Sequence, residues 1–316
     1  MPRLEQRLWR QHPVTVMTVD PRLTSLTLVR TTTGLQSLSA LAAEQGLTTA
    51  INGGFFNRFT QHPLGALRWQ HQWWSSPILG RGVVAWTDQG EVRLERLRWL
   101  GSLTGEGLAV PIVTLNSGYV VPGVAAYDHH WGSQYLPQTD DELVVVIRDG
   151  RVDGLYPGLG AGQHAFALSP DQWLVVARTP LGWQQVQDVM QGSPVQLTVQ
   201  MDPPELARFP NMLGAGPLLI QDGQIVLDAE RERFQPAFQQ QRAARSALCV
   251  GDTVQMIRVG VAQETVGVTL AELATMLQEW GCPSALNLDG GSSTALVWQG
   301  QALSPGSLVH NGIGVR

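Results

Sequence analysis

The sequence contains no lysine, so all 21 of its basic residues are arginine. Without lysine the protein cannot form a Schiff base with a carbonyl substrate or use a lysine-dependent phosphate loop. It has only two cysteines, which excludes a four-cysteine zinc site and a dense disulfide scaffold. We expect Cys249 and Cys282 to be buried free thiols, and a disulfide between them is the alternative.

Charged residues and long apolar runs are also scarce. Only 15% of the residues are charged, and the net charge of −5 provides no basic field to hold a nucleic acid. No apolar run approaches the roughly 18 residues that a membrane span needs. Met1–Arg10 lacks the apolar core of a secretion signal. We therefore expect no nucleic-acid partner, no membrane span and no signal peptide in this chain.

Glycine, proline and apolar residues are plentiful instead. The chain has 34 glycines and 19 prolines, and 43% of its residues are hydrophobic, which is enough for a sizeable core. In four segments an Asp-Gly or Gln-Gly pair stands between β-prone apolar runs, the usual signature of a hairpin. These segments are Ala85–Leu94, Val144–Asp153, Leu218–Asp228 and Thr294–Leu303. Hairpins at this frequency predict antiparallel sheets.

Two segments have helical spacing, Leu35–Gln45 and Thr269–Trp280. The second begins with Thr269 and Glu272, a capping box that satisfies free N–H groups at a helix start. Because helices are few and hairpins many, we predict an α+β fold of mainly antiparallel sheet. No polar low-complexity linker divides the chain, so we expect a single domain over residues 1–316.

The same unit follows each predicted helix. After the first comes a short apolar strand that ends in Asn52–Phe56, which reads NGGFF. After the second comes Ser284–Leu288, followed by Asp289–Thr294, which reads DGGSST. A helix, a buried strand, a polar side chain and two glycines thus occur near both ends of the sequence. This repetition predicts internal pseudo-symmetry and a site that both segments share.

Asp289 is the strongest candidate for chemistry. It follows an apolar strand and precedes Gly290 and Gly291, which let a ligand approach without obstruction by a Cβ atom. Ser292 and Ser293 add hydroxyl groups, and backbone N–H groups of such a turn can hold an anion. The alternative is an ordinary turn that is capped by its own carboxylate.

Other candidate residues are less decisive. Arg245 precedes a predicted buried strand and needs a partner, which is either a structural carboxylate or a bound anion. Phe55 and Phe56 either line an apolar pocket or lie in the core, and we favour the core. His129 and His130 are adjacent, so on a strand they would point to opposite faces. Their spacing does not support a zinc site.

Taken together, the motifs resemble those of the phosphodiester glycosidase family, the family of N-acetylglucosamine-1-phosphodiester α-N-acetylglucosaminidase. In chain order the matching segments are Asn52–Phe56, Tyr127–Gly132, Gly214–Gly223, Arg245–Leu248, Leu286–Leu296 and Asn311–Val315. The most specific of them is the Asp-Gly-Gly segment. Because the six segments span nearly the whole chain, the resemblance covers the whole predicted domain.

The resemblance implies an enzyme that hydrolyses a GlcNAc-like sugar from a sugar-1-phosphodiester, giving free sugar and a phosphate monoester. By position it implies that Asp289, Arg245 and Asn52 are catalytic. The substrate-binding residues that it implies are Gly53, Gly54, Phe55, Gly214, Gly216, Gly290, Gly291, Ser292, Ser293 and Asn311. The family also suggests an extracytoplasmic protein that acts on a phosphate-linked sugar or polysaccharide of the bacterial cell envelope or exopolysaccharide.

We expect Asp289 to act as nucleophile or general base at the anomeric carbon. A single carboxylate could suffice there, because a phosphate leaving group needs less protonation than a sugar alcohol. The sequence does not select a second catalytic carboxylate; Asp128, Asp222 and Glu264 are candidates, and we favour a turn or surface position for each of them. The sequence requires no cofactor. A divalent cation bound by oxygen atoms of Asp289 and Asn52 is left open.

Two other functions are also open. Many family members carry a Gly-Glu-Arg stretch before the final strand, where this chain has Pro305–Leu308. If that arginine grips phosphate, its absence favours a non-catalytic domain that binds carbohydrate or a cell-envelope polymer. The other function is that of a phosphodiesterase, which would break the P–O bond instead of the C–O bond.

Overall fold

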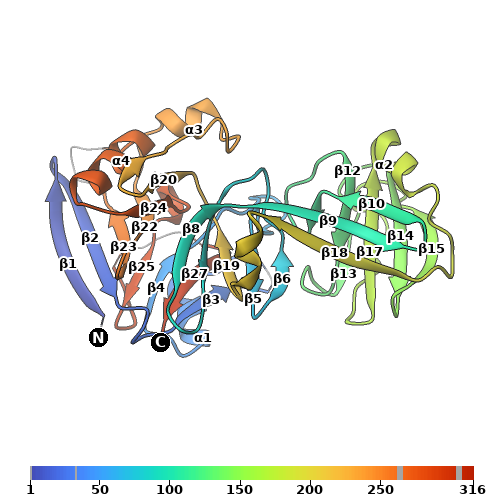
Figure 1. Ribbon diagram of the computed structural model, residues 1–316, viewed down its shortest axis with the longest axis horizontal. Helices are drawn as coiled ribbons and strands as arrows, with labels where there is room; N and C mark the ends of the chain where they lie inside the picture. Colours follow the sequence, from blue (N-terminus) through green and yellow to red (C-terminus); the bar gives the residue numbers. More distant parts are fainter. Residues whose placement is uncertain (1, 33, 262–265, 304–307) are drawn as a thin grey trace.

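The computed structural model describes residues 2–32, 34–261, 266–303 and 308–316. It is elongated and has two lobes (Figure 1). Both chain ends lie in one lobe, which we call the terminal lobe. The other, which we call the middle lobe, is built from residues 98–202, between the start of β9 and the end of β18. Antiparallel sheets dominate both lobes and helices are few, which confirms the predicted α+β class.

The terminal lobe contains a seven-stranded antiparallel sheet. In spatial order its strands are β1 (Arg3–Trp9), β2 (His12–Val19), β23 (Val254–Val259), β22 (Arg245–Val250), β24 (Ser284–Asn287), β20 (Leu218–Gln221) and β21 (Gln224–Ile225). Every residue of the central strand β22 is buried. Burial on both faces explains why this segment reads as an apolar run rather than as an alternating pattern.

Two five-stranded antiparallel sheets complete the terminal lobe. The β4 sheet has the order β26 (Gln301–Ala302), β25 (Leu296–Trp298), β4 (Thr49–Asn52), β27 (Asn311–Val315) and β3 (Leu26–Arg30). The β7 sheet has the order β6 (Gln72–Ser75), β5 (Leu67–Trp69), β19 (Asn211–Gly214), β7 (Gly82–Trp86) and β8 (Val92–Arg96). Strands from both ends of the chain therefore pair within one sheet.

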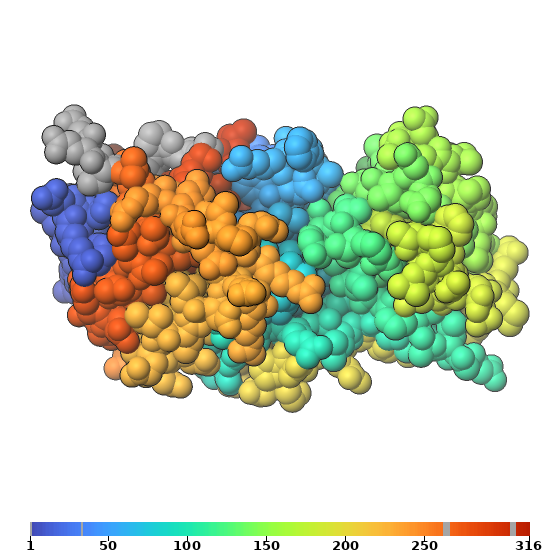
Figure 2. Space-filling view, turned by 90° about the horizontal axis from the view of Figure 1, so that it is seen from above, coloured from blue at the N-terminus to red at the C-terminus, as the bar shows by residue number. Residues whose placement is uncertain are grey.

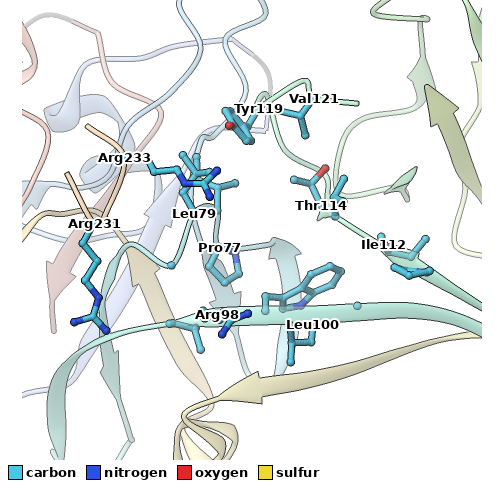
Figure 3. Close-up of a pocket in the computed structure, with 17 residues that line it drawn as sticks. Pro77, Leu79, Arg98, Leu100, Ile112, Thr114, Tyr119, Val121, Arg231 and Arg233 are labelled. Carbon is cyan, nitrogen blue, oxygen red and sulfur yellow. The ribbon is translucent and has the colours of Figure 1, made fainter. Parts of the chain in front are cut away.

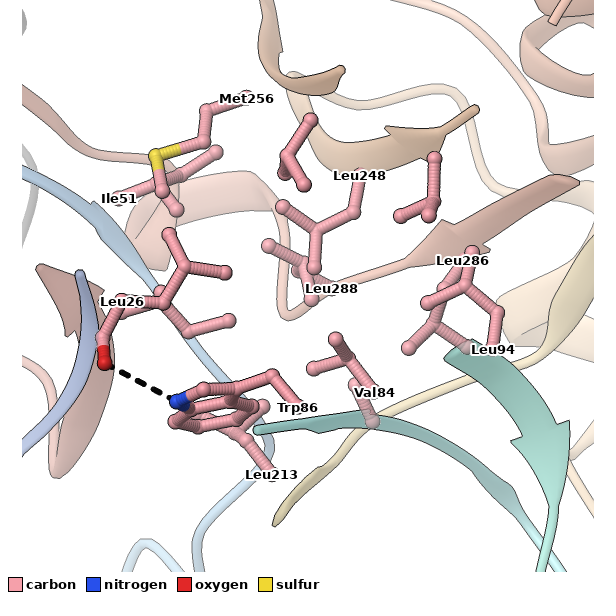
Figure 4. Close-up of a cluster of buried hydrophobic side chains, with 14 of the residues drawn as sticks. Leu26, Ile51, Val84, Trp86, Leu94, Leu213, Leu248, Met256, Leu286 and Leu288 are labelled. Atoms are coloured by element: carbon pink, nitrogen blue, oxygen red, sulfur yellow. Dashed lines mark hydrogen bonds between the residues drawn. The ribbon is translucent and has the colours of Figure 1, made fainter. Parts of the chain in front are cut away.

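The main core lies where these three sheets face one another (Figure 4). Trp86 is almost completely buried there, and its indole N–H donates to the carbonyl of Leu26 at 3.0 Å. Leu213, Leu248 and Leu286 bring side chains from the other strands to the same cluster. Because a buried indole N–H needs an acceptor, this hydrogen bond fixes how the β7 sheet sits against β3.

Helix α4 (Leu270–Glu279) covers the other face of the seven-stranded sheet. Its predicted capping box is present, with Thr269 and Glu272 each bonded to the other's backbone N–H. Our expectation of two free thiols is wrong, because Cys249 on β22 and Cys282 after α4 form a disulfide. The chain leaves α4 directly toward β24, the neighbour of β22, and this return brings the two cysteines together.

The other helices are short. Helix α1 (Leu38–Glu44) begins later than predicted, because the hydroxyl of Ser37 accepts a hydrogen bond from the N–H of Ala40 and caps it there. The remaining helical elements are α2 (Thr179–Val186), α3 (Pro236–Gln240), and the 3₁₀ turns η1 (Pro204–Arg208) and η2 (Gly291–Ser293).

The middle lobe holds three further sheets. The first has the order β10 (Leu108–Ile112), β9 (Arg98–Gly105) and β18 (Val195–Asp202). The second has the order β11 (Thr114–Leu115), β12 (Gly123–Tyr127), β17 (Gln172–Arg178), β14 (Glu142–Arg148) and β15 (Arg151–Pro157). The third pairs β13 (Gln134–Tyr135) with β16 (Phe166–Ala167). A buried ion pair joins Arg178 to Glu142 at 2.7 Å. The hydroxyls of Tyr127 and Tyr135 accept further hydrogen bonds from Arg178, so this charge is compensated inside the lobe.

All four predicted hairpins form. They are β7–β8, β14–β15, β20–β21 and β25–β26, each antiparallel. Among the described residues, no helix has the length and apolar character needed to cross a bilayer. The single domain over residues 1–316 and its internal pseudo-symmetry stay predictions.

Candidate active site

The Asp289 turn lies at the junction of the seven-stranded sheet and the β4 sheet. The N–H of Asp289 donates to the carbonyl of Gly53 at 2.9 Å, which ties the end of β24 to the end of β4. On the other side, the N–H of Gly291 donates to the carbonyl of Ala244, just before β22. The two predicted Gly-Gly segments therefore meet, as the sequence pattern indicated.

Asn52 lies beneath this turn and is completely buried. Its side-chain N–H donates to the carbonyl of Asp289 at 2.7 Å. Its side-chain oxygen accepts from the hydroxyl of Ser246 at 2.6 Å and from the N–H of Ala295 at 3.0 Å. Since both lone pairs of this oxygen are engaged, Asn52 positions the turn and has no oxygen lone pair left for a cation.

Gly53 and Gly54 serve close packing. A Cβ atom on Gly53 would lie 2.3 Å from the side-chain oxygen of Asn311, and one on Gly54 would lie 2.0 Å from the carbonyl of Gly214. Asn311 accepts a hydrogen bond from the N–H of Gly54 at 2.7 Å. These residues support the site from behind, as does Gly216, where a Cβ atom would lie 2.6 Å from a buried carboxylate oxygen.

A cavity of about 1190 Å³ opens in front of Asp289, and we call it the Asp289 cavity. In the described chain its lining includes one carboxylate, that of Asp289, and four arginines, Arg58, Arg81, Arg233 and Arg245. Gly290, Gly291, Ser292 and Ser293 form one edge of it. Figure 2 shows the segment that contains α3, in orange, reaching toward the green residues of the middle lobe.

Three phenylalanines form an aromatic wall of the Asp289 cavity. The ring of Phe55 lies 5.5 Å from that of Phe234 and 5.7 Å from that of Phe238, centroid to centroid. The guanidinium of Arg81 stacks over Phe234 at 3.9 Å, and that of Arg245 lies 5.3 Å from the ring of Phe238. Our preference for Phe55 in the core is therefore wrong, because it is only half-buried and faces the cavity with Phe56.

Glu232 fixes the loop that carries part of this wall. Its buried carboxylate accepts from the N–H groups of Gly82 and Leu218, both at 2.9 Å, and from Arg96 at 2.9 Å. Burial raises the pKa of Glu232, while these partners favour its ionised form. Phe234 follows two residues later, so the carboxylate anchors the wall to β7 and β20.

Two opposing influences act on the carboxyl of Asp289. Burial raises its pKa to about 6 from the ordinary value of 3.8. Hydrogen bonds from Ser293 and from the N–H of Gly290 act in the opposite direction, as do the charges of Arg58 and Arg245. A carboxyl group with this pKa is mostly ionised at pH 7 but still basic enough to take a proton.

Arg245 is buried against backbone carbonyls rather than against a carboxylate. Its guanidinium donates to the carbonyl of Val268 at 3.1 Å and to that of Gln241. Burial lowers the pKa of Arg245 to about 10, and the nearby Asp289 acts in the opposite direction. The side chain therefore stays positively charged at neutral pH and lines the cavity beside Asp289.

The backbone N–H groups of the turn are mostly engaged within the protein. Those of Gly291, Ser293 and Thr294 donate to carbonyls, and that of Gly290 donates to the Asp289 carboxylate at 2.9 Å. This differs from the expectation that the turn would hold an anion with its N–H groups. The positive charge in the Asp289 cavity comes from arginine side chains instead.

His129 and His130 do not point to opposite faces. They follow β12 in a turn, and their rings lie side by side with centroids 4.1 Å apart. His130 also bonds the carboxylate of Asp128 at 3.0 Å, and ligand atoms of these three residues lie within 4.8 Å of one another. Asp128 and Asp222 are both absent from the described lining of the Asp289 cavity. Glu264 lies outside the described residues.

Comparison with known families decides the relationship. The family model described as phosphodiester glycosidase matches residues 111–316, about two thirds of the chain. The chain belongs to the phosphodiester glycosidase family. No curated protein matches it.

Solved structures share the fold of this family member. A hypothetical protein from Synechocystis is 38% identical, with a TM-score of 0.93 over 99% of this chain and 62% of its own. The chain thus spans less than two thirds of that protein. A putative exported protein from Burkholderia pseudomallei is 19% identical, with a TM-score of 0.77 over 96% of this chain and 74% of its own.

A more distant likeness is to the catalytic domain of zebrafish N-acetylglucosamine-1-phosphodiester α-N-acetylglucosaminidase, which that structure shows auto-inhibited by its pro-peptide. The identity is 13% and the TM-score 0.47, over 100% of this chain and 82% of the zebrafish chain. At this level of similarity the likeness carries no weight for function.

The structure brings together only part of the predicted site. The predicted residues that line the Asp289 cavity are Phe55, Arg245, Asp289, Gly290, Gly291, Ser292 and Ser293. Those absent from its lining are Asn52, Gly53, Gly54, Gly214, Gly216 and Asn311. Sequence reasoning missed Arg58, Arg81, Arg233, Phe234 and Phe238. Their local signal is weak, although Arg-Glu-Arg-Phe at 231–234 does concentrate charge beside an aromatic residue.

Proposed function

We propose that the protein is a hydrolase that releases a GlcNAc-like sugar from a sugar-1-phosphodiester. The observation that carries this proposal is the pairing of one carboxylate, Asp289, with the arginines of the same cavity. A phosphodiester carries a single negative charge, which a guanidinium binds well. A phosphate leaves readily, so one carboxylate suffices where most glycosidases use a pair.

In this proposal Asp289 acts as general base. It takes a proton from water as the water oxygen bonds to the anomeric carbon, and the bond from that carbon to the phosphate oxygen breaks. The electron pair leaves on the phosphate, whose charge Arg245 and Arg58 balance. The pKa of about 6 suits a base that works near neutral pH. The phenylalanine wall packs against the sugar, and Asn52 holds the turn in place.

The test is release of free N-acetylglucosamine from a GlcNAc-1-phosphodiester by the full chain, with and without EDTA. Replacing Asp289 by Asn removes the base, so we expect turnover to fall by roughly 10²–10⁴-fold. Asp222→Asn, on an exposed hairpin turn, is the matched control and should keep full activity. Unchanged turnover in Asp289→Asn would exclude this role, and a loss of activity with EDTA would show that a metal is required.

Labelled water separates hydrolysis at carbon from hydrolysis at phosphorus. In ¹⁸O-water the proposed reaction places the label in the sugar, whereas a phosphodiesterase would place it in the phosphate. NMR can identify which anomer of the sugar is released first, and this shows whether Asp289 acts as a base or as a nucleophile. Direct attack by water inverts the anomeric centre, whereas a covalent intermediate leads to retention. Saturable binding without product would instead favour the non-catalytic carbohydrate-binding alternative.

We also propose that the protein works in an oxidising, extracytoplasmic compartment. The Cys249–Cys282 disulfide supports this, because disulfides persist in such compartments and are rare in a reducing cytosol. Turnover of a phosphate-linked exopolysaccharide or cell-envelope polymer is the role that would fit such a location.

A further inference from the structure

A second cavity continues from the Asp289 cavity into the space between the lobes. It has a volume of about 750 Å³, and we call it the interlobe cavity. The two cavities share Leu79, Tyr119 and Arg233 in their linings. Figure 3 shows Arg233 beside Leu79, with Tyr119 above them, and Arg98 and Leu100 on β9 across the cavity. A substrate with its sugar at Asp289 can therefore extend into this space.

The combined cleft is positively charged although the whole protein is acidic. In the described chain its lining holds six arginines and one carboxylate, that of Asp289, while the net charge of the protein is −5. The interlobe cavity contributes Arg98 and Arg231 to this set and adds no described carboxylate to the lining. A cleft lined by one sign of charge attracts a ligand of the opposite sign, and more strongly a ligand with several such charges.

Arg233 stands at the point where the two cavities join. The loop alternates, with Glu232 and Phe234 buried and with Arg231 and Arg233 exposed. Since Glu232 is held by three hydrogen bonds, the loop is fixed while the arginines face outward. Arg233 also has a φ of 54°, a left-handed conformation that is uncommon for residues other than glycine and is often found at functional sites.

The guanidinium groups of Arg231 and Arg233 have no ion pair within the described part of the chain. Arg98 is partly engaged, because its guanidinium lies 3.5 Å from the exposed carboxylate of Asp202. Arg81 and Arg245, by contrast, donate to backbone carbonyls. The charge that is free for a second anionic group is therefore concentrated at Arg233, with Arg231 and Arg98 behind it.

Most of the other side chains that line the interlobe cavity are apolar, with Thr114 and Tyr119 as the polar ones. Pro77, Ile112, Val121 and Leu100 lie around it, together with the indole of Trp99. Such a surface suits an aromatic or aliphatic group attached to the anionic one.

We propose that the substrate carries a second phosphate, so that the sugar is linked through a diphosphate to an apolar or aromatic group. The second phosphate would bind at Arg233, and the attached group would occupy the interlobe cavity. This rests on the proposed function: water attacks the anomeric carbon, its proton passes to Asp289, and the diphosphate leaves with the electron pair. The attached group is a nucleoside or a lipid, and the substrate contains the same diphosphate in either case.

The test compares substrates that share one sugar. GlcNAc-1-phosphate methyl ester has one phosphate, UDP-GlcNAc has two and a nucleoside, and a short-chain prenyl diphospho-GlcNAc has two and a lipid. We expect kcat/KM to be about 10-fold higher for at least one of the diphosphates, and the faster one identifies the source. Arg233→Gln should reduce that value about 10-fold through KM, and it should reduce kcat/KM for the methyl ester by a clearly smaller factor. Arg3→Gln, on the exposed edge strand β1, is the control for loss of one charge.

Equilibrium binding keeps this test independent of catalysis. Titration of UDP into the protein, with UMP as the comparison, should show tighter binding of UDP that Arg233→Gln weakens about 10-fold. If no ester is hydrolysed but this binding is found, the proposed function fails and the diphosphate site stands. If all esters are hydrolysed equally and Arg233→Gln changes none of them, the diphosphate site is wrong and the hydrolase stands. Absence of both hydrolysis and binding would overturn both.

Discussion

Asp289 is partly shielded from water and lies beside two arginines, and these surroundings push its proton affinity in opposite directions. Burial has the larger effect, so the pKa rises to about 6 despite the charges of Arg58 and Arg245. A carboxyl group in this state has consequences both for activity and for stability, and the two can be measured separately.

Activity should fall as the pH decreases through about 6, because protonation removes the base. The measurement is kcat/KM for a GlcNAc-1-phosphodiester between pH 4 and 8, and we expect an acidic limb with its midpoint near 6. The Asp222→Asn control should leave that limb in place. A limb centred near 4, the ordinary value for aspartate, would show that burial does not act on Asp289 as described.

Stability should change in the opposite sense to activity. The pKa of Asp289 is about 6 in the folded protein against 3.8 ordinarily, so the folded state binds more protons in that window and loses stability as the pH rises through it. Above pH 6 the ionised group costs on the order of 2–3 kcal/mol. Asp289→Asn should therefore raise the free energy of unfolding, measured by urea denaturation, at pH 7.5. At pH 4.5 the same substitution should raise it much less. Equal effects at both pH values would argue against this.

At the scale of elements, the loop between β21 and α3 depends on one buried side chain. Glu232 accepts hydrogen bonds from β7, from β20 and from Arg96 on β8. The same loop carries Phe234 and Arg233, which line the Asp289 cavity. Its anchor therefore controls the shape of the cavity without lining it.

Removing that anchor should affect binding more than chemistry. Glu232→Ala leaves two buried N–H groups and Arg96 without their acceptor, so we expect a loss of about 3–5 kcal/mol in stability and a several-fold rise in KM. kcat should change less, because Asp289 is held by other contacts. Glu230→Gln, two residues earlier and exposed, is the control, and Glu232→Gln keeps the shape while removing the charge. A kcat loss as large as that of Asp289→Asn would contradict a positioning role.

Local sequence patterns predicted the elements well where the decisive interactions are themselves local. Asp-Gly turns specify hairpins within a few residues, and the Thr269–Glu272 capping box sets the start of α4. The start of α1 was misplaced because the Leu35 pattern continues past the Ser37 cap. The Cys249–Cys282 disulfide was only the less favoured alternative, since it depends on how α4 packs across the sheet.

At the scale of the whole molecule, the two lobes share the cleft rather than meeting at a flexible linker. Strand β9 of the middle lobe begins only two residues after β8 of the terminal lobe ends. Strand β18, which leads back to the terminal lobe, pairs with β9 along its full length. The interlobe cavity is lined from both lobes. The single domain over residues 1–316 stays a prediction, which unfolding experiments can test.

A single domain should unfold in one cooperative step. We expect thermal transitions followed by far-UV circular dichroism and by tryptophan fluorescence to coincide, since tryptophans lie in both lobes. Separate transitions would instead show that the middle lobe, with its own core and the buried Arg178–Glu142 pair, folds as an independent unit.

The site itself was only half predictable at this scale. Asp289 and Arg245 stand next to strands whose apolar pattern and glycines draw attention to them. Arg81 and Arg233 lie more than 150 residues apart in sequence, and no local pattern says that both face the same cavity. Conversely, Gly53 was predicted to bind substrate, yet its missing side chain makes room for Asn311. Such contacts depend on the whole fold.

The junction beneath Asp289 also has a consequence for synthesis on the ribosome. Asn52 and Asp289 are 237 residues apart, and Gly54 bonds Asn311, which is 257 residues further along the chain. A nascent chain therefore carries β4 for most of its translation before the strands that complete the turn emerge. Asp289 is held in place only after Asn311 has emerged, so under the proposed function we expect shorter translation products to be inert toward phosphate-linked sugars.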